Sequence, residues 1–197
     1  MRSSAALLSL LVLPLSLATP AHAGDGVFGV FFDRTGTNCS GTVPVASVAT
    51  LHVVLLPQGS TFAGIMGAEF SITAAQNATF LFQGESVESG AIQLGTALNG
   101  GTSIGFSACH SGGTIPVLAF QVINLGGTAH DVEMRVAPKA SPSNPLLQCP
   151  VAVLCDDPQF TAICAGGARG ILNPSAQQPC GAGRSAAGWD YVKDMYR

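Results

Sequence analysis

Charged residues are scarce in this sequence. Asp, Glu, Lys and Arg make up 10% of the 197 residues, with eight basic and 11 acidic side chains and a net charge of −3. Proteins that bind nucleic acid or anionic lipid do so through clustered Lys and Arg, and this chain contains no such cluster. We therefore expect no nucleic acid and no lipid surface among its partners.

Long apolar runs are also missing, except at the beginning of the chain. Arg2 precedes an apolar run from Ala5 to Ala18, which Pro14 interrupts and the small-residue sequence Ala21-His22-Ala23 follows. This run of 14 residues is shorter than the roughly 20 needed to span a bilayer. The pattern predicts a signal peptide over residues 1–23, cleaved between Ala23 and Gly24, and a secreted chain, extracellular or periplasmic, with no transmembrane anchor.

Aromatic residues other than Phe are rare. The single Trp and both Tyr lie in the last nine residues, as Trp189, Tyr191 and Tyr196. Sugar-binding proteins usually offer exposed aromatic platforms, so this scarcity disfavours carbohydrate binding. Trp189, Val192 and Tyr196 are spaced i, i+3, i+7, which would place them on one side of a short helix in a tail over residues 183–197.

A recognisable catalytic set is missing as well. Gly101-Thr102-Ser103-Ile104-Gly105 matches the G-x-S-x-G nucleophile elbow of hydrolases, but an elbow leads from a strand into a helix, and the residues that follow Ser103 read as strand. No acid lies between Glu88 and Asp131, so none precedes His130 in the required order. Gly181-Ala182-Gly183-Arg184-Ser185-Ala186 imitates a dinucleotide fingerprint without its strand, its helix or its downstream acid.

The remaining polar candidates have ordinary structural explanations. The histidines of the mature chain, His52, His110 and His130, show no metal-binding spacing, and no oxygen-rich calcium loop surrounds the acid pair Asp156-Asp157. A second acid pair, Glu85 and Glu88, would need a suitable separation across a scissile bond to act as a glycosidase. We expect no cofactor, no metal and no catalytic residue. N-glycosylation patterns occur at Asn38-Cys39-Ser40 and Asn77-Ala78-Thr79, where chance matches are the simpler explanation.

Short apolar or alternating segments recur about every ten residues and are separated by Gly, Pro, Asn and Ser, which is typical of an all-β sandwich or barrel. We predict a single antiparallel β-sandwich, jelly-roll-like or similar, of about nine strands in a domain over residues 24–146. The expected strands are Val27 to Asp33, Ser47 to Pro57, Gly67 to Ala74, Ala78 to Gln83, Ala91 to Leu98, Ser103 to Cys109, Pro116 to Asn124, Asp131 to Ala137 and Val151 to Cys155.

Two kinds of strand can be told apart. Ala68, Phe70, Ile72 and Ala74 alternate with polar residues, as do Val132, Met134 and Val136, so each of these two strands should have one buried and one wet face. Leu51 to Leu56 and Val117 to Ile123 are nearly continuous apolar runs. They are expected in the middle of the sandwich.

Six cysteines, an even number in an exported chain, favour three disulfides. They are Cys39, Cys109, Cys149, Cys155, Cys164 and Cys180. Of the 15 possible pairings we prefer Cys39–Cys109, Cys155–Cys164 and Cys149–Cys180. A zinc site formed by the last four is the alternative, although their C-x5-C-x8-C-x15-C spacing lacks the close pairs usual for zinc. The Cys-, Gly- and Pro-rich residues 147–182 are expected to form a stapled region with little regular structure, packed on the sandwich or extending it.

The sequence Gly67-Ala68-Glu69-Phe70-Ser71-Ile72, followed by Thr114-Ile115-Pro116-Val117-Leu118-Ala119-Phe120-Gln121-Val122, resembles the strands of cohesin-like modules. These are secreted bacterial β-sandwiches related to carbohydrate-binding modules. The resemblance extends over roughly residues 43–137. The chain has Thr73-Ala74-Ala75 where cohesins usually have Tyr-Asp-Pro.

The resemblance and the missing catalytic set together favour a secreted, non-catalytic binding or structural protein. It would act as an adhesion or scaffold module at a cell surface or in an extracellular matrix, with a protein or polysaccharide surface as its partner. A carbohydrate-binding module is the first alternative, and a secreted hydrolase is the second. The sequence does not determine the oligomeric state or the identity of the partner.

Overall fold

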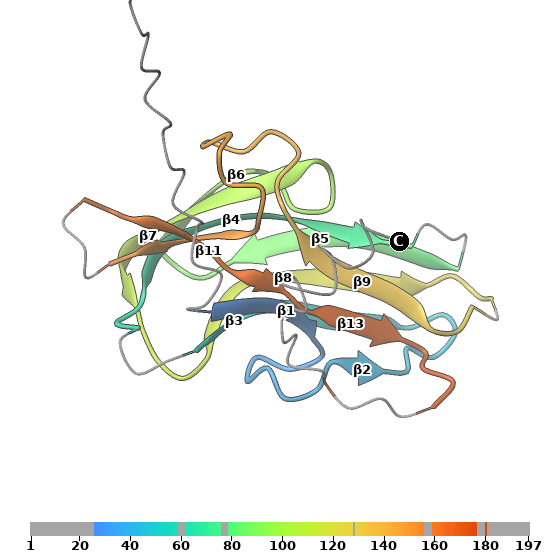
Figure 1. Cartoon of the computed structure of the whole chain (residues 1–197). Helices are drawn as coiled ribbons and strands as arrows, with labels where there is room; N and C mark the ends of the chain where they lie inside the picture. Colours follow the sequence, from blue (N-terminus) through green and yellow to red (C-terminus); the bar gives the residue numbers. More distant parts are fainter. Residues whose placement is uncertain are drawn as a thin grey trace, which may run out of the picture.

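The computed structural model describes residues 26–58, 62–75, 79–127, 129–155, 159–176 and 180. All regular structure in these ranges is β, and the strands form two sheets that pack face to face (Figure 1). The strands are β1 (Gly26–Phe31), β2 (Ser40–Gly41), β3 (Val48–Pro57), β4 (Ile65–Ala74), β5 (Phe80–Val87), β6 (Ala91–Thr96), β7 (Gly101–His110), β8 (Ile115–Asn124), β9 (Val132–Ala137), β10 (Val151–Leu154), β11 (Ala162–Cys164), β12 (Gly166–Gly167) and β13 (Arg169–Leu172).

The first sheet has the order β12-β1-β3-β8-β5. Its central strands β3 and β8 pair antiparallel, with Leu51 opposite Phe120. The two nearly continuous apolar runs therefore do form the middle of this sheet, as predicted from the sequence. Strand β5 pairs with β8 and is the last strand of the sheet, so its other edge has no strand partner among the described residues.

The second sheet is built around β4. The first half of β4, up to Phe70, lies between β10 and β7, and β6 and β11 extend the sheet from these neighbours. The second half, Ser71 to Ala74, pairs with β9, from which β13 and β2 continue the sheet. Because β7 stops pairing at Phe70, where Thr102 lies opposite, one edge of the second half of β4 has no strand beside it within the described residues.

The core fills the space between the two sheets with residues at alternating strand positions. Phe70 on β4 is fully buried, and its ring centroid lies 5.4 Å from that of Phe28 on β1. The predicted buried faces are confirmed for Ala68, Phe70 and Ile72 and for Val132, Met134 and Val136. Two residues of β4 depart from the pattern: Glu69 and Ser71 occupy the alternate positions that were predicted to be wet, and yet they are only 7% and 8% exposed. Other parts of the chain must therefore cover these positions.

The region over residues 147–176 is more regular than the sequence suggested. β12 pairs parallel with β1, while β13 pairs antiparallel with β9 and parallel with β2, so this region adds strands to both sheets and the sheets are not purely antiparallel. Glycines let these short strands approach strands that they do not pair with, because a Cβ atom at Gly167 on β12 would collide with the Val136 carbonyl oxygen of β9, and one at Gly170 on β13 would lie 2.8 Å from the Val30 oxygen of β1. β10 matches the predicted strand Val151 to Cys155, whereas β11, β12 and β13, of two to four residues, carry no periodic signal and were not predicted.

All six cysteines form disulfides, as predicted, but each of the three preferred pairings was wrong. The bonds are Cys39–Cys180, Cys109–Cys155 and Cys149–Cys164. The preferred pairs joined cysteines by short loops or by strand ends, whereas strand pairing decides the actual neighbours. Cys164, the last residue of β11, lies opposite Val151 on β10 and so comes close to Cys149. Cys109 precedes His110, the last residue of β7, which lies opposite Ile65 at the start of β4. Cys39–Cys180 covers the outer face of the first sheet, where it packs with the buried side chains of Phe31 and Val54.

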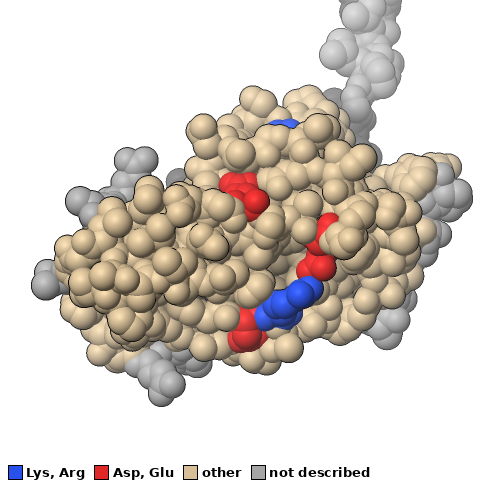
Figure 2. All heavy atoms as spheres, turned by 180° about the vertical axis from the view of Figure 1, so that it is seen from behind, with Lys and Arg blue, Asp and Glu red and all other residues tan. Residues whose placement is uncertain are grey.

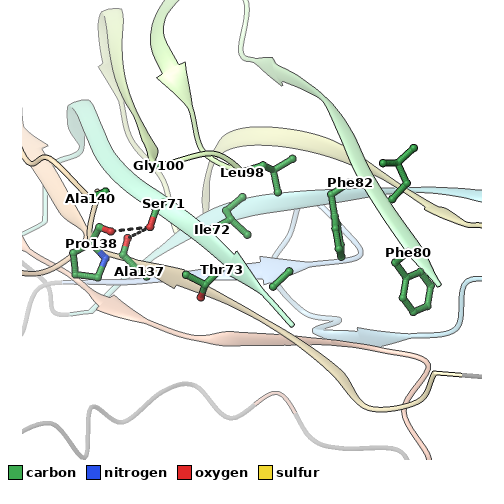
Figure 3. Close-up of a pocket in the computed structure, with 12 residues that line it drawn as sticks. Ser71, Ile72, Thr73, Phe80, Phe82, Leu98, Gly100, Ala137, Pro138 and Ala140 are labelled. Atoms are coloured by element: carbon green, nitrogen blue, oxygen red, sulfur yellow. Dashed lines mark hydrogen bonds between the residues drawn. The ribbon is translucent and has the colours of Figure 1, made fainter. Parts of the chain in front are cut away.

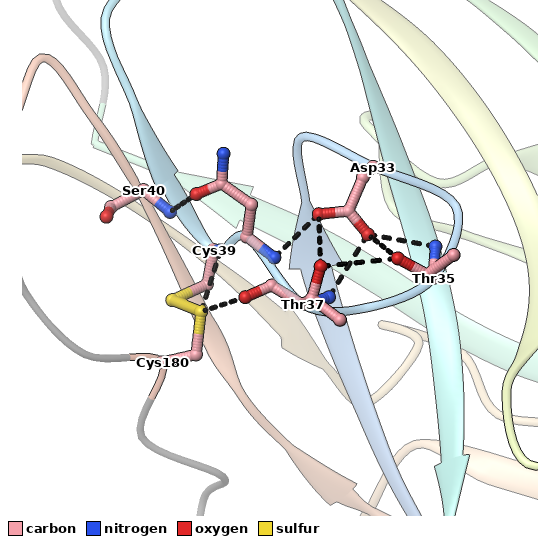
Figure 4. Close-up of a disulfide and its surroundings, with 7 residues drawn as sticks. Asp33, Thr35, Thr37, Cys39, Ser40 and Cys180 are labelled. Carbon is pink, nitrogen blue, oxygen red and sulfur yellow. Dashed lines mark hydrogen bonds between the residues drawn. A yellow bond between two sulfur atoms is a disulfide. The ribbon is translucent and has the colours of Figure 1, made fainter.

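The turn that leads to Cys39 is organised by one carboxylate (Figure 4). Asp33 accepts hydrogen bonds from the backbone N–H groups of Thr35 (2.9 Å), Thr37 (3.1 Å) and Asn38 (2.6 Å) and from both threonine hydroxyls. Burial is the largest single influence on the pKa of Asp33 and raises it, but the hydrogen bonds from Thr35, Thr37 and Asn38 together outweigh burial and lower the pKa to about 2. The charged form of Asp33 thus fixes the turn that carries one end of a disulfide.

Replacing Thr35 by valine should raise the pKa of Asp33 from about 2 toward the ordinary 3.8, because one hydroxyl donor is lost. Since the folded pKa is depressed, the contribution of Asp33 to stability is present above pH 3.8 and is lost as the pH falls toward 2. Carboxyl-carbon NMR titration measures the midpoint. Thr50→Val, on an exposed position of β3, is the matched control, and an unchanged Asp33 midpoint in Thr35→Val would contradict this account of the turn.

Gly64 occupies a position that no other residue fits. Its φ angle is +141°, and a Cβ atom there would lie 2.5 Å from the His110 oxygen and 2.8 Å from Cys109 Sγ. Gly64→Ala should therefore reduce the free energy of unfolding by about 2 kcal/mol in urea titrations. Gly105→Ala is the control, because a Cβ atom there meets nothing within 4 Å, and its effect should stay within about 0.5 kcal/mol. Equal losses in the two variants would refute the steric argument.

Candidate functional site

A groove of about 970 Å³ lies between β5 and the second half of β4 (Figure 3). The groove exists because the free edge of β5 faces the edge of β4 that β7 leaves uncovered, and neither edge has a strand partner in the described ranges. Pairing of β4 with β7 ends at Phe70. Beyond this point the turn after β6 contacts the same edge of β4 through a hydrogen bond from Ile72 N to the Ala97 oxygen (2.8 Å). We call this hollow the β4–β5 groove.

The β4–β5 groove has an apolar lining. Ile72, Phe80, Phe82 and Leu98 contribute large side chains, and the segment after β9 closes one side. None of the lining residues is ionisable, and Ser71 Oγ already donates to the Pro138 oxygen (2.7 Å). The full lining consists of Ser71, Ile72, Thr73, Ala74, Phe80, Leu81, Phe82, Leu98, Gly100, Ala137, Pro138 and Ala140. Such a surface can bind uncharged apolar groups, but it offers no acid or base for chemistry.

A second hollow, of about 460 Å³, shares Leu98 with the groove and continues it along β5. Its lining is more polar and includes Gln83, Glu85 and Gln93. The Glu85 carboxylate accepts hydrogen bonds from Gln93 Nε2 (2.6 Å), Ala97 N (2.9 Å) and Leu98 N (2.8 Å). Glu85 therefore holds the turn after β6 in place and, with it, the Leu98 side chain that both hollows share.

One wall of the β4–β5 groove depends on a charge cluster behind it. Residues 138–143, which we call the strap, leave the groove at Pro138 and pass over Glu69 on β4. Ser143 donates its backbone N–H (2.8 Å) and its hydroxyl to the Glu69 carboxylate, and Lys139 Nζ lies 3.4 Å from Glu69 Oε2. Ser103 Oγ donates to Glu69 (2.7 Å) and accepts from Lys139 Nζ (2.8 Å). The strap thus explains why Glu69 is buried on a face that the sequence predicted to be wet.

The environment of Glu69 favours its ionised form. Burial raises the pKa of this carboxyl, but the hydrogen bonds from Ser143 and Ser103 and the nearby ammonium of Lys139 together hold it below its ordinary value. The carboxylate is charged at neutral pH and keeps Lys139 paired. The cluster is therefore a structural anchor for the strap and for the groove wall.

Seen from behind the view of Figure 1, the surface carries few charged side chains among uncharged ones (Figure 2). A further hollow, of about 170 Å³, is lined by Arg34, His52 and Glu88, and Arg34 pairs with Glu88. Burial and the nearby Arg34 guanidinium lower the pKa of His52, so this imidazole is neutral at pH 7. Arg34 and Glu88 therefore neutralise each other's charge in this ion pair.

The structure places the sequence candidates as follows. Ser103 is the third residue of β7, and the chain continues after it as a strand to His110, so the G-x-S-x-G match is no nucleophile elbow. Nevertheless the fold joins Ser103 to Glu69 and Lys139, a cluster that the sequence did not signal, because its members are 34 and 36 residues from Ser103. The acid pair Glu85 and Glu88 does not form a joint site, because Glu85 accepts a hydrogen bond from Gln93 and Glu88 pairs with Arg34. Of the two N-glycosylation patterns, the first has an exposed Asn38, and in the second Thr79 is buried.

The three histidines are not brought together. His52 lies on β3 and His110 on β7, in different sheets, while His130 precedes β9. In the described ranges, no group of three or more His, Cys, Asp or Glu could hold a metal ion, and no helix long and apolar enough to cross a membrane occurs. The predicted signal peptide with its Ala23–Gly24 cleavage site, Asp156-Asp157, Asn77, Gly181 to Ala186 and the predicted tail helix lie outside the described residues.

Comparison with known proteins identifies the type of fold. A cohesin module of a family 33 glycoside hydrolase from Clostridium perfringens matches with a TM-score of 0.50 and 7% identity, covering 77% of this chain and 98% of that chain. A type I cohesin from Pseudobacteroides cellulosolvens matches with a TM-score of 0.50 and 10% identity, covering 78% and 94%. The fold is cohesin-like. No family model and no curated protein matches the sequence.

The cohesin-like resemblance predicted from residues 43–137 is thus confirmed at the level of the fold. At 7–10% identity the match carries no information about the partner. The cohesin-like sandwich of this chain has features of its own that bear on function: three disulfides, the strap over Glu69 and the uncharged β4–β5 groove.

Proposed function

We propose that this chain is an exported, non-catalytic binding module that holds an extended segment of a protein partner in the β4–β5 groove. The observation that carries the proposal is the groove itself, which is apolar, lacks ionisable groups and is bordered by two strand edges. Extended segments are bound at such edges by backbone hydrogen bonds, while pockets take alternate side chains. An uncharged lining selects uncharged side chains.

Three disulfides support export, because such bonds persist in oxidising compartments outside the cytosol. The state of the polar groups supports a non-catalytic role. The carboxylates of Asp33, Glu69 and Glu85 each accept at least three hydrogen bonds, and the Ser103 hydroxyl lies between Glu69 and the charged Lys139. These hydrogen bonds hold a turn, the strap and the turn after β6 in place, which gives each of the three carboxylates a structural role.

A protein segment fits the groove better than a polysaccharide does. Among the described residues the only aromatic side chains besides His are phenylalanines, and in the groove Phe80 is buried and Phe82 half-buried. Neither ring forms a flat exposed platform for a sugar. The exposed Phe160 lies outside the groove lining.

The test is peptide display against the immobilised mature chain, residues 24–197. Selected peptides should be rich in uncharged apolar residues. Their affinity should fall about tenfold, equivalent to 1.4 kcal/mol, in Ala140→Phe, which fills the groove. Ala162→Phe, at an exposed position on β11, is the matched control and should bind normally.

Equal binding to both variants would refute the groove as the site. A glycan array run in parallel decides between partner classes: glycan binding that Ala140→Phe abolishes would replace the protein partner by a polysaccharide. Turnover of an ester, peptide or glycoside substrate that is lost in Ser103→Ala would overturn the non-catalytic assignment.

A further inference from the structure

We propose that the partner segment carries a Lys or Arg beside its apolar part, and that Glu85 selects this basic residue in the hollow that continues the β4–β5 groove along β5. The inference rests on the proposed function and deepens it, because it adds a charge and a spacing to the chemistry of the segment. It is carried by the bulge that turns Glu85 toward the hollow, by the unpaired charge of this carboxylate and by the shortage of hydrogen-bond donors around it.

A bulge in β5 turns Glu85 toward the hollow. Between Gln83 and Ser86, β5 takes three steps while β8 takes two, so these two residues share the outer face of the sheet. Gly84 supplies the extra residue, with a φ angle of +66° that glycine adopts easily. Strict alternation from Phe82 would place Glu85 on the outer face. The bulge instead brings Glu85 to the side of Phe82, which lines the groove.

The Glu85 carboxylate has no cationic partner among the described residues. Its three hydrogen bonds come from neutral donors, the side-chain amide of Gln93 and the backbone N–H groups of Ala97 and Leu98. The ion pairs found in the described ranges involve other carboxylates. A cation of a partner that approaches Glu85 therefore meets a complementary charge that this part of the chain does not already pair.

On the inner side of the hollow, the side-chain donors are already engaged. Gln93 Nε2 donates to Glu85 and to the Gly95 oxygen (3.2 Å), which uses both hydrogens of its amide. The Thr96 hydroxyl donates to the Asn99 oxygen (3.4 Å). A carboxylate has about four acceptor positions, of which Glu85 uses three. An ammonium or a guanidinium suits this lining, because each consists of donors alone and leaves no acceptor unpaired.

The distance along β5 sets the spacing of the partner's residues. Glu85 follows Phe82 by three positions, which is roughly 10 Å in a strand. A segment paired with the free edge of β5 would hold apolar side chains near Phe80 and Phe82, and its backbone pairing would end at the bulge. The Lys or Arg is therefore expected about three residues beyond the apolar part, at one end of the segment.

Peptides selected by display on the mature chain test the charge directly. We expect them to carry a Lys or Arg at this spacing from their apolar residues. Neutralising that side chain, by acetylation of Lys or by replacement of Arg with citrulline, should weaken binding about fivefold at low salt. The difference should shrink at about 0.5 M salt, because salt screens a half-exposed charge pair.

Variants of Thr96 test the site while Glu85 and its hydrogen bonds to the turn stay in place. Thr96 is exposed and lines the same hollow. Thr96→Lys supplies an ammonium from the chain itself and should abolish the preference for the charged peptide over its neutralised form, whereas Thr96→Glu should increase that preference. Thr50→Lys and Thr50→Glu, at an exposed position of β3, are the matched controls and should leave it unchanged. Urea midpoints equal to wild type would show that the variants are folded.

The outcomes separate this inference from the proposed function. Peptides that depend on Ala140 but carry no basic residue, or bind equally well once it is neutralised, would overturn the inference and leave the function standing. A charge preference that Thr96→Lys removes would support the inference. If Ala140→Phe then left the binding of the basic peptide unchanged, the hollow would bind without the groove and the proposed function would fall.

Discussion

Replacing Glu69 by glutamine is expected to reduce the free energy of unfolding by about 3 kcal/mol, a large part of the 5–15 kcal/mol typical of a domain. The Glu69 side chain is 9% exposed and pairs with Lys139, whose side chain is 21% exposed. Glutamine leaves this ammonium without its partner and places an amide where Ser143 needs an acceptor. Urea denaturation of the oxidised mature chain measures the loss.

Two further variants test the reason for the effect. Glu133→Gln removes a surface carboxylate that pairs with Arg135 and Arg169, and should cost less than about 1 kcal/mol. Lys139→Met added to Glu69→Gln should recover part of the loss, because no unpaired charge remains. A Glu69→Gln effect as small as that of Glu133→Gln would show that the strap is not anchored by charge.

The same residue predicts an acid dependence. The pKa of Glu69 is depressed in the folded state, so its contribution is present above its ordinary pKa of 4.5 and is lost as the pH falls through the lower folded value. Glu69→Gln should therefore unfold less steeply with acid below pH 4.5 than the wild type. Because the strap closes the groove, peptide affinity should weaken in parallel with this loss.

Removing the Cys39–Cys180 disulfide should have the largest single effect on stability. The two residues are 141 positions apart, and a loop of this length corresponds to about 5 kcal/mol of lost conformational freedom in the unfolded chain. We expect Cys39→Ala/Cys180→Ala to lower the urea midpoint strongly. Val54 would also lose part of the cover on its outward face, which adds to the loss.

The matched control is Cys149→Ala/Cys164→Ala, whose loop of 15 residues predicts about 3 kcal/mol. The ratio of the two losses tests the loop-length argument, and equal losses would contradict it. Peptide mapping without reductant should recover the same three pairs that the structure contains. Recovery of Cys39–Cys109 instead would refute the arrangement of the C-terminal strands.

The predicted strands were accurate where each segment carried its own signal. The alternating residues of β4 and β9 face the core as expected, and the apolar runs of β3 and β8 lie in the centre of their sheet. The disulfide pairing could not be predicted in this way, because it depends on which strands meet. Cys109 and Cys155 are 46 residues apart and become neighbours only because β7 and β10 flank β4.

The candidate site was beyond the reach of the sequence for the same reason. Phe82, Leu98 and Ala140 have nothing in common as sequence positions, and they meet because β7 stops pairing with β4 at Phe70. Glu69 was assigned to a wet face because the alternation of side chains shows only which residues of one strand share a face. It does not show whether a strap 70 residues away covers that face. Only the hydrogen bonds of Ser143 and the charge of Lys139 reveal that this face is covered.

The sequence by itself determined the all-β character, the buried faces of the alternating strands and the use of six cysteines in disulfides, because these follow from side-chain alternation and from composition. The tertiary structure alone decided the disulfide partners, the four short additional strands, the cover over Glu69 and the β4–β5 groove. Each of these arises where residues distant in sequence are brought together by backbone pairing, whose hydrogen-bonding groups are the same in every residue except proline and therefore leave little trace in the amino-acid sequence.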